Sequence, residues 1–155
     1  MNIVMAEKKH IPGMLALLRQ VGQVHHVGRP DLFRDGAIKY NAEELEAILQ
    51  DPNAPIFIAE EEDVLGYCFC QVQIVEENPC ILGRKELYID DLCVDEKARG
   101  KHIGTALYDA VVKLAKETGC YNLTLNVWSC NPSAMAFYQS RGLVPQKIGM
   151  EMILE

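Results

Sequence analysis

The segment Val94–Leu107 has the residue types of a phosphate-binding turn. It reads V-D-E-K-A-R-G-K-H-I-G-T-A-L, so that a predicted strand runs into a glycine-containing turn and then directly into a predicted helix. The first N–H groups of a helix have no partner within the helix, and they carry about half a positive charge that favours an anion. Gly100 and Gly104 let the backbone approach oxygen atoms without a Cβ in the way. Arg99 and Lys101 add two cations, so the segment predicts a diphosphate site.

Other interpretations of this turn differ in how well they match its residues. A Walker loop needs Gly-Lys followed by Ser or Thr at the helix start, and a Rossmann turn needs G-x-G-x-x-G. Neither pattern occurs here. An ordinary strand-to-helix turn, in which glycine serves steric needs alone, stays open on the turn by itself.

Two adjacent acids, Asp90 and Asp91, lie inside the apolar segment E-L-Y-I-D-D-L-C-V of residues 86–94. Side chains alternate along a strand, so the two carboxylates are expected on opposite faces. Carboxylates inside an apolar strand are costly unless they are solvated or functional. One function is general-base catalysis, in which a positioned carboxylate accepts a proton from a reacting group. Solvated acids at the edge of a pocket are the alternative.

The elements that must position these residues can be predicted from periodicity and capping patterns. Strands are expected over residues 2–6, 54–60, 64–75, 86–94, 121–128 and 143–154, and helices over 8–24, 41–50, 104–118 and 131–141. Asn41 with Glu44 forms a capping-box pattern, and Asn131 precedes a proline at the first helical position. Residues 25–40 are expected to form a polar loop. This order predicts an α/β fold with a mixed sheet, in one domain over residues 1–155.

Composition excludes several classes of function. The 155 residues carry a net charge of −7 with no compensating basic cluster, so nucleic acid and membrane surfaces are not expected as partners. No apolar run reaches the roughly 18 residues of a membrane helix, and the N-terminus does not resemble a signal peptide, so a cytoplasmic location is expected. The six cysteines lack zinc-ligand spacing, and we interpret them as reduced thiols with no metal bound.

Two motifs in order resemble the GNAT superfamily of acyl-CoA-dependent N-acetyltransferases. The first family pattern, Q/R-x-x-G-x-G/A, matches Arg99–Gly104 except at His102, where the pattern prefers glycine. The second, N-x-x-A-x-x-x-Y-x-x-x-G, is matched at every position by Asn131, Ala134, Tyr138 and Gly142. The resemblance covers residues 86–142 and implies the GNAT fold, in the order β-α-α-β-β-β-α-β-α-β, with a mostly antiparallel sheet that splays at the cofactor site.

The resemblance also implies acetyl-CoA as the co-substrate. The pantetheine arm would fill the gap between splayed strands and pair with main-chain groups like an added strand. The residues implied in cofactor binding are Leu92, Cys93 and Val94 on the splayed strand, Arg99, Gly100, Lys101, His102, Ile103, Gly104 and Thr105 around the diphosphate, and Asn131 and Ala134 in the last helix. If His102 required a positive φ, its Cβ would cost on the order of 1 kcal/mol.

The implied reaction is direct transfer of acetyl to a primary amine of a small molecule or peptide. Tyr138 occupies the family's general-acid position. Full proton transfer from a phenol of pKa about 10 to a thiolate of about 8.5 is uphill by about 2 kcal/mol, so we expect Tyr138 to act by hydrogen bonding to sulfur. Backbone N–H groups near Cys93 or Val94 would stabilise the oxyanion. A covalent acyl-enzyme on Cys93 is disfavoured because no activating base lies nearby in sequence.

The base has several candidates. Residues 86–94 also resemble the strand of diamine acetyltransferases, which implies Asp90 as base and Asp91 as a contact for a cationic substrate. His25 and His26 are rivals, because the loop after the first helix borders the acceptor site in this superfamily and histidine has the better pKa. Asn126 stands where some relatives have glutamate, and it cannot take a proton.

A homodimer is expected, and a non-catalytic acyl-CoA sensor is the alternative function.

Overall fold

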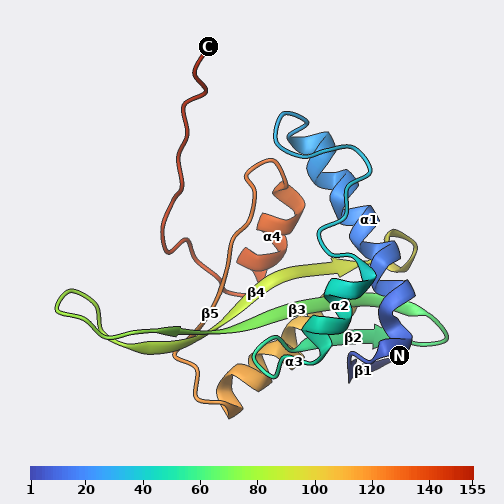
Figure 1. Ribbon diagram of the computed structural model, residues 1–155, viewed down its shortest axis with the longest axis horizontal. Coiled ribbons are helices and arrows are strands. Elements are labelled where there is room, and N and C mark those ends of the chain that lie inside the picture. The colour runs from blue at the N-terminus through green and yellow to red at the C-terminus, as the bar shows by residue number, and fades with distance from the viewer.

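A single five-stranded sheet organises the computed structural model, which describes residues 1–155 (Figure 1). The strands are β1 (Asn2–Met5), β2 (Ile56–Glu60), β3 (Val64–Val75), β4 (Arg84–Val94) and β5 (Asn122–Leu125), and they lie in this order across the sheet. Neighbours from β1 to β4 are antiparallel, whereas β4 and β5 are parallel. The expected mixed, mostly antiparallel sheet is therefore confirmed.

Helices cover both faces of the sheet. They are α1 (Ile11–Gly28), preceded by the short turn η1 (Lys8–His10), α2 (Ala42–Leu49), α3 (Ile103–Glu117), preceded by η2 (Glu96–Ala98), and α4 (Pro132–Ser140). Alternation along β3 separates two cores: Tyr67 and Phe69 pack under α1 and α2, and Cys68 and Cys70 pack against α3. None of the helices combines the length and apolar character needed to cross a lipid bilayer.

Most of the predicted elements are present, with shifted ends. The capping box of Asn41 and Glu44 starts α2 as expected, and β3 has the predicted bounds. The first helix is longer than predicted. It continues through His25 and His26 to Gly28, because no residue of the V-H-H-V segment breaks a helix before Gly28 and the nearby proline at position 30. The expected loop therefore begins one turn later.

The predicted final strand, Leu143–Leu154, is not formed. Residues 143–155 have no regular secondary structure, and Figure 1 shows them running away from the sheet after α4. The period-2 apolar pattern that predicted the strand is real, but a strand also needs a hydrogen-bonding neighbour, and this segment has none in its own chain. The sheet consequently ends at β5.

Candidate active site

The strands β4 and β5, at one edge of the sheet, separate partway along β4. They are paired only between Glu86–Ile89 and Asn122–Leu125, whereas β4 continues to Val94. On its other side, β4 stays paired with β3 as far as Val94. On the side that faces β5, the main-chain groups of the last β4 residues therefore have no neighbouring strand. This is the predicted splay, where an extended ligand can pair with these free main-chain groups.

A β-bulge brings the two acids of β4 to one face. Phe69 of β3 pairs with Asp91, but the next residue, Cys70, pairs with Ile89, so Asp90 is an extra residue. As a result Ile89 faces the α3 core and Cys93 faces the α1–α2 core, although strict alternation would put both on one face. The expectation that the two carboxylates lie on opposite faces is therefore wrong, because it assumed a strand without a bulge.

Asp91 is held from the core side by a buried residue of β3. The Tyr67 hydroxyl donates a hydrogen bond to its Oδ2 atom over 2.6 Å. Burial is the main cause that raises the pKa of Asp91 to about 6, and the charge of Asp90 raises this pKa further. The Tyr67 hydrogen bond and the charge of Lys39 act in the opposite direction and lower it. A carboxylate with this pKa is charged at neutral pH and is a stronger base than an ordinary aspartate.

Asp90 is held by residues of the segment that precedes α2. The Lys39 Nζ atom lies 2.8 Å from its Oδ1 atom, and the Tyr40 hydroxyl donates to its Oδ2 atom over 2.6 Å. Burial, and then the Asp90 hydrogen bond, raise the pKa of Tyr40, so this phenol remains a donor. Neither Lys39 nor Tyr40 was identified from the sequence, because the contact joins residues about 50 positions apart.

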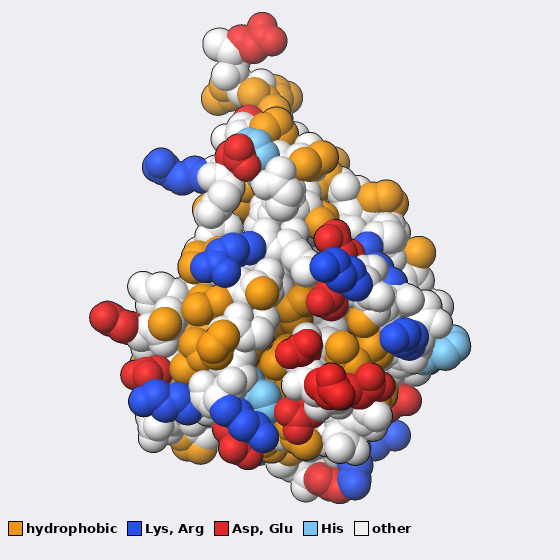
Figure 2. Space-filling view, turned by 90° about the vertical axis from the view of Figure 1, so that its right-hand side faces the viewer, with side chains coloured by type: hydrophobic (Ala, Val, Ile, Leu, Met, Phe, Trp, Pro, Cys, Tyr) orange, Lys and Arg blue, Asp and Glu red, His pale blue; other side chains and the backbone are white.

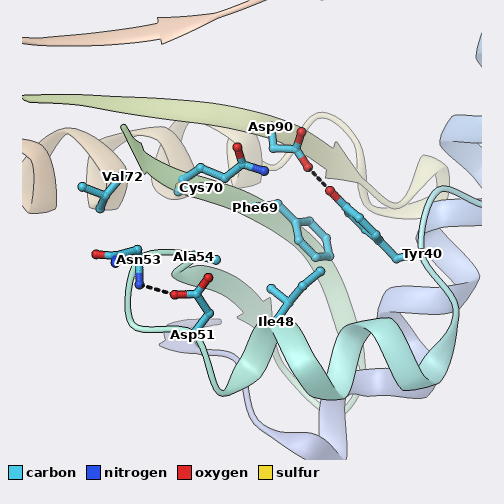
Figure 3. Close-up of a pocket in the computed structure, with 10 residues that line it drawn as sticks. Tyr40, Ile48, Asp51, Asn53, Ala54, Phe69, Cys70, Val72 and Asp90 are labelled. Carbon is cyan, nitrogen blue, oxygen red and sulfur yellow. Dashed lines mark hydrogen bonds between the residues drawn. The ribbon is translucent and has the colours of Figure 1, made fainter. Parts of the chain in front are cut away.

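A groove with a volume of about 380 Å³ extends from Asp90 along the sheet (Figure 3). Tyr40 and Asp90 lie at one end and Asp51 and Asn53 toward the other, with Phe69 among the side chains between them. Apolar residues form most of the lining. The groove can therefore hold a small molecule that has an apolar stem and a polar or cationic group.

The turn before α3 has the features of an anion site. Gly100 and His102 both have positive φ angles, 83° and 59°, and His102 is the one non-glycine residue of the chain with this geometry. No side chain caps the first turn of α3, and this turn contains no acid. Arg99 and Lys101 flank it in sequence. These uncapped N–H groups and cations fit the diphosphate of acetyl-CoA.

The helix α4 carries Tyr138 and lies against the first turn of α3. A Cβ on Gly104 would lie 3.5 Å from the Phe137 ring, so α4 packs on the first turn of α3. Tyr138 is the next residue, and its pKa is raised by burial first and then by Cys68 and Asp91. The phenol therefore stays protonated. Asn131 caps α4 through its side-chain oxygen, which accepts from Ala134 N at 3.3 Å, and its amide nitrogen is left to donate elsewhere.

His25 and His26 end α1 next to an aromatic cluster. The His25 ring lies 4.9 Å from Phe33, and Phe33 meets Trp128 edge-on at 5.2 Å. Burial, and then Lys39, lower the pKa of His25, which favours its neutral form. The His26 Nδ1 atom lies 2.7 Å from the carbonyl oxygen of Phe33. This cluster joins α1, the following loop and the segment after β5, and periodicity offered no signal for Phe33.

Cys93 does not have the environment of a nucleophile. Its thiol points toward α1, where Sγ lies 3.7 Å from the carbonyl oxygen of Leu17. Burial and then the charge of Asp91 raise the pKa of Cys93 to about 12. The side chain stays neutral, and the main chain is the part of this residue that faces the splay.

Comparison with known proteins extends this description. A model of the acetyltransferase (GNAT) family matches residues 23–143. The BH1408 protein of Bacillus halodurans, solved as a mutant, is 30% identical over 100% of both chains, with a TM-score of 0.96. An aminoglycoside N-acetyltransferase solved in complex with CoA is 17% identical over 99% of both chains, with a TM-score of 0.72, and shares the fold.

A curated Drosophila melanogaster protein, "Probable glucosamine 6-phosphate N-acetyltransferase", is 29% identical over 133 residues, which are 85% of this chain and 55% of that protein. The matched part of the chain covers 39% of the length of one curated relative and 55% of the length of another. The chain therefore spans about half the length of these relatives or less.

Proposed function

We propose that this chain, which belongs to the acetyltransferase (GNAT) family, transfers an acetyl group from acetyl-CoA to the primary amine of a small molecule or peptide. The observation that carries the proposal is a convergence on one gap in the sheet. The uncapped start of α3, the buried carboxylate of Asp91 and the phenol of Tyr138 all border the place where β4 leaves β5. A binding module needs only the first of these features.

Acetyl-CoA would supply the activated acyl group, and the chain would hold it with main-chain groups. Leu92, Cys93 and Val94 would pair with the pantetheine arm, as an added strand does. The segment Arg99–Thr105 would contact the diphosphate through backbone N–H groups and flanking cations. Asn131 would contribute its side-chain nitrogen to the same arm.

The chain's residues have separate tasks in the transfer. A carboxylate accepts the amine proton as the nitrogen–carbon bond forms, and a backbone N–H near Cys93 or Val94 stabilises the oxyanion. As the carbon–sulfur bond breaks, the Tyr138 hydroxyl donates a hydrogen bond to the departing thiolate. The raised pKa of Tyr138 supports this donor role rather than complete proton transfer.

Two assignments of the base are in competition. The family resemblance assigns the base to Asp90 and a substrate contact to Asp91. The surroundings favour the reverse, because Asp90 is already paired with Lys39, whereas Asp91 is buried with a pKa of about 6. We therefore propose Asp91 as the base and Asp90 as an acceptor contact, with His25 and His26 as further acceptor contacts.

The pH dependence of kcat/KM distinguishes the two acids. With Asp91 as base, the wild-type profile should rise as this carboxylate loses its proton near pH 6. The Asp91→Asn variant should lose that inflection and about 100-fold in kcat. The matched Asp90→Asn variant should keep the inflection and raise KM. The opposite pattern would return the base to Asp90, and an inflection that survives in both variants would exclude both acids.

The acceptor is best sought with a panel of amines, acetyl-CoA and detection of the free thiol. The panel should include glucosamine 6-phosphate, because curated relatives carry its name. It should also include alkyl diamines and lysine peptides, which suit a groove with carboxylates and an apolar floor. Turnover of one amine, reduced at least tenfold by Tyr138→Phe, supports the proposal. Tight binding of CoA with no turnover across the panel would favour the sensor alternative.

The proposal includes the cytoplasmic location and the homodimer that the sequence predicts. The exposed apolar side chains of Ile148, Met150 and Met152 support the homodimer.

A further inference from the structure

The amine of Lys39 lies at the point where β4 parts from β5. The pairing of these two strands ends at Ile89, so Asp90 is the first residue of β4 without a partner in β5. The Lys39 Nζ atom lies 2.8 Å from the Oδ1 atom of Asp90 and 3.5 Å from its main-chain oxygen. A primary amine of the chain itself therefore rests at the start of the splay, on the carboxylate that we propose as a contact for the acceptor.

The residues around Lys39 hold its amine in this position. Ile38 and Tyr40, its neighbours in sequence, pack against the core under α1 and α2. The ammonium lies 5.6 Å from the centre of the Tyr40 ring, within the range of a cation–π contact. Its charge lowers the pKa of both Asp91 and His25, so the amine is within electrostatic reach of the buried acid and of the end of α1.

Exposure and charge do not distinguish Lys39 from the other lysines. Lysine and arginine side chains are spread over the face drawn in Figure 2, with acidic side chains among them. Lys8 is more exposed than Lys39, and its partner is Glu46 of α2. Lys101 lies in the turn before α3, at the diphosphate end of the proposed cofactor site. Lys39 differs from both because its partner is an acid at the splay.

The direction of the proposed cofactor brings the acyl group to this amine. The diphosphate would lie at residues 99–105, and the pantetheine arm would pair with residues 92–94. An arm that runs from the turn along these strand residues has its thioester end next to Asp91 and Asp90. An amine that is held beside a reacting carbon attacks it in an effectively unimolecular step.

We propose that Lys39 is an internal acetyl acceptor, so that the chain, loaded with acetyl-CoA and without an external amine, acetylates its own Lys39 Nζ atom. This inference rests on the proposed acetyl transfer and adds a modification site to it. The product is a neutral amide at position 39, which no longer pairs with Asp90 as a cation.

The transfer to Lys39 balances with the groups at the site. The ammonium loses one proton to a carboxylate of the acid pair, and the nitrogen lone pair then forms a bond to the thioester carbon. The carbon–sulfur bond breaks with its electron pair on sulfur, to which the Tyr138 hydroxyl donates a hydrogen bond. A second proton leaves the new amide nitrogen and converts the thiolate to the CoA thiol.

Peptide mass spectrometry of the whole protein, incubated with acetyl-CoA and no added amine, tests the inference. One acetyl group should be found per chain, on Lys39, while Lys8 and Lys101 stay unmodified. Lys39→Arg keeps a positive charge beside Asp90 but offers no nucleophilic amine, and it should gain no acetyl group. An unmodified Lys39, or equal acetylation of Lys8 and Lys101, would overturn the inference.

Two rate measurements test whether the chain itself carries out this transfer. Tyr138→Phe keeps Lys39 and should slow its acetylation by about tenfold or more. A chemical reaction with free acetyl-CoA would run equally fast in this variant and would overturn the inference. Because the amine and the reacting carbon belong to one complex, the rate per chain should not change when the protein is diluted about tenfold at saturating acetyl-CoA. A rate that falls in proportion would show transfer between chains and exclude an internal acceptor.

Failure of this inference is distinguishable from failure of the proposed function. An amine of the panel that is acetylated while Lys39 stays unmodified would refute the internal acceptor and leave the proposed function intact. The absence of both reactions in a chain that binds CoA would refute the two together.

Discussion

The helices α2 and α3 begin in opposite ways. At the start of α2, the Asn41 side chain accepts from Glu44 N at 2.8 Å and the Glu44 side chain accepts from Asn41 N at 3.1 Å. The first turn of α2 is acidic. At the start of α3, no side chain caps the helix, no acid is present in the first turn, and His102 has a left-handed backbone.

The difference shows how one physical feature serves two purposes. Every helix start presents unpaired N–H groups and a partial positive charge. In α2 the chain satisfies these groups itself, which stabilises a helix of only eight residues. In α3 they are left available, and the helix is stabilised instead by core residues such as Leu107 and Val111. The start of α3 is thus suited to a ligand at the expense of local stability.

The largest effect is expected when an acid is placed in the first turn of α3, as in α2. Gly104→Glu should raise the Kd for acetyl-CoA about 100-fold, because two like charges about 4 Å apart repel by roughly 1–4 kcal/mol. The folded protein should keep its stability, since an acid suits a helix N-terminus. Calorimetric titration measures the Kd. Gly104→Gln separates charge from size, and equal losses in both variants would show that size alone matters.

A smaller effect is expected when the cap of α2 is removed. Asn41→Ala should lower the free energy of unfolding by about 1 kcal/mol, because the N–H of Glu44 loses its acceptor. Urea denaturation measures this loss. The Kd for acetyl-CoA should not change, since the two helix starts are independent. Glu43→Gln, an exposed change in the same turn, is the control, and a shared loss of CoA affinity would contradict the comparison.

The backbone strain at His102 predicts a still smaller gain. His102→Gly removes a Cβ from a left-handed conformation that costs roughly 1–2 kcal/mol, and part of this is lost to the greater freedom of glycine in the unfolded chain. The net gain in unfolding free energy should be about 0.5 kcal/mol by urea denaturation. His102→Ala keeps the Cβ and should bring no gain. Destabilisation by glycine would mean that the imidazole itself makes a stabilising contact.

Salt should have the smallest effect. Raising the ionic strength from about 0.05 to 0.3 M should weaken acetyl-CoA binding by about threefold, because Arg99 and Lys101 act on the diphosphate through a screened field. Desulfo-CoA, which keeps the diphosphate, should show the same dependence. A Kd that does not respond to salt would assign the binding energy to neutral N–H groups alone.

Much of the fold and the cofactor turn could be predicted from sequence because the signals are local. The capping box of Asn41, the proline after Asn131 and the spacing from Arg99 to Gly104 each act within a few residues, and so they predict the starts of α2, α4 and α3. The acidic turn Glu61–Asp63 likewise predicts where β3 begins. Local backbone chemistry does not depend on which segment lies opposite.

Tertiary structure alone decided how the two acids of β4 and the C-terminal residues 143–155 are placed. The bulge at Asp90 arises from its pairing with β3, and it puts both carboxylates of β4 on one face, which a strand pattern cannot reveal. Lys39 and Tyr40 reach Asp90 only through the packing of the segment before α2. Residues 143–154 have the pattern of a strand yet form none, because strand formation depends on a neighbouring edge. Side-chain periodicity is encoded along the chain, whereas hydrogen-bonding partners are supplied by segments distant in sequence.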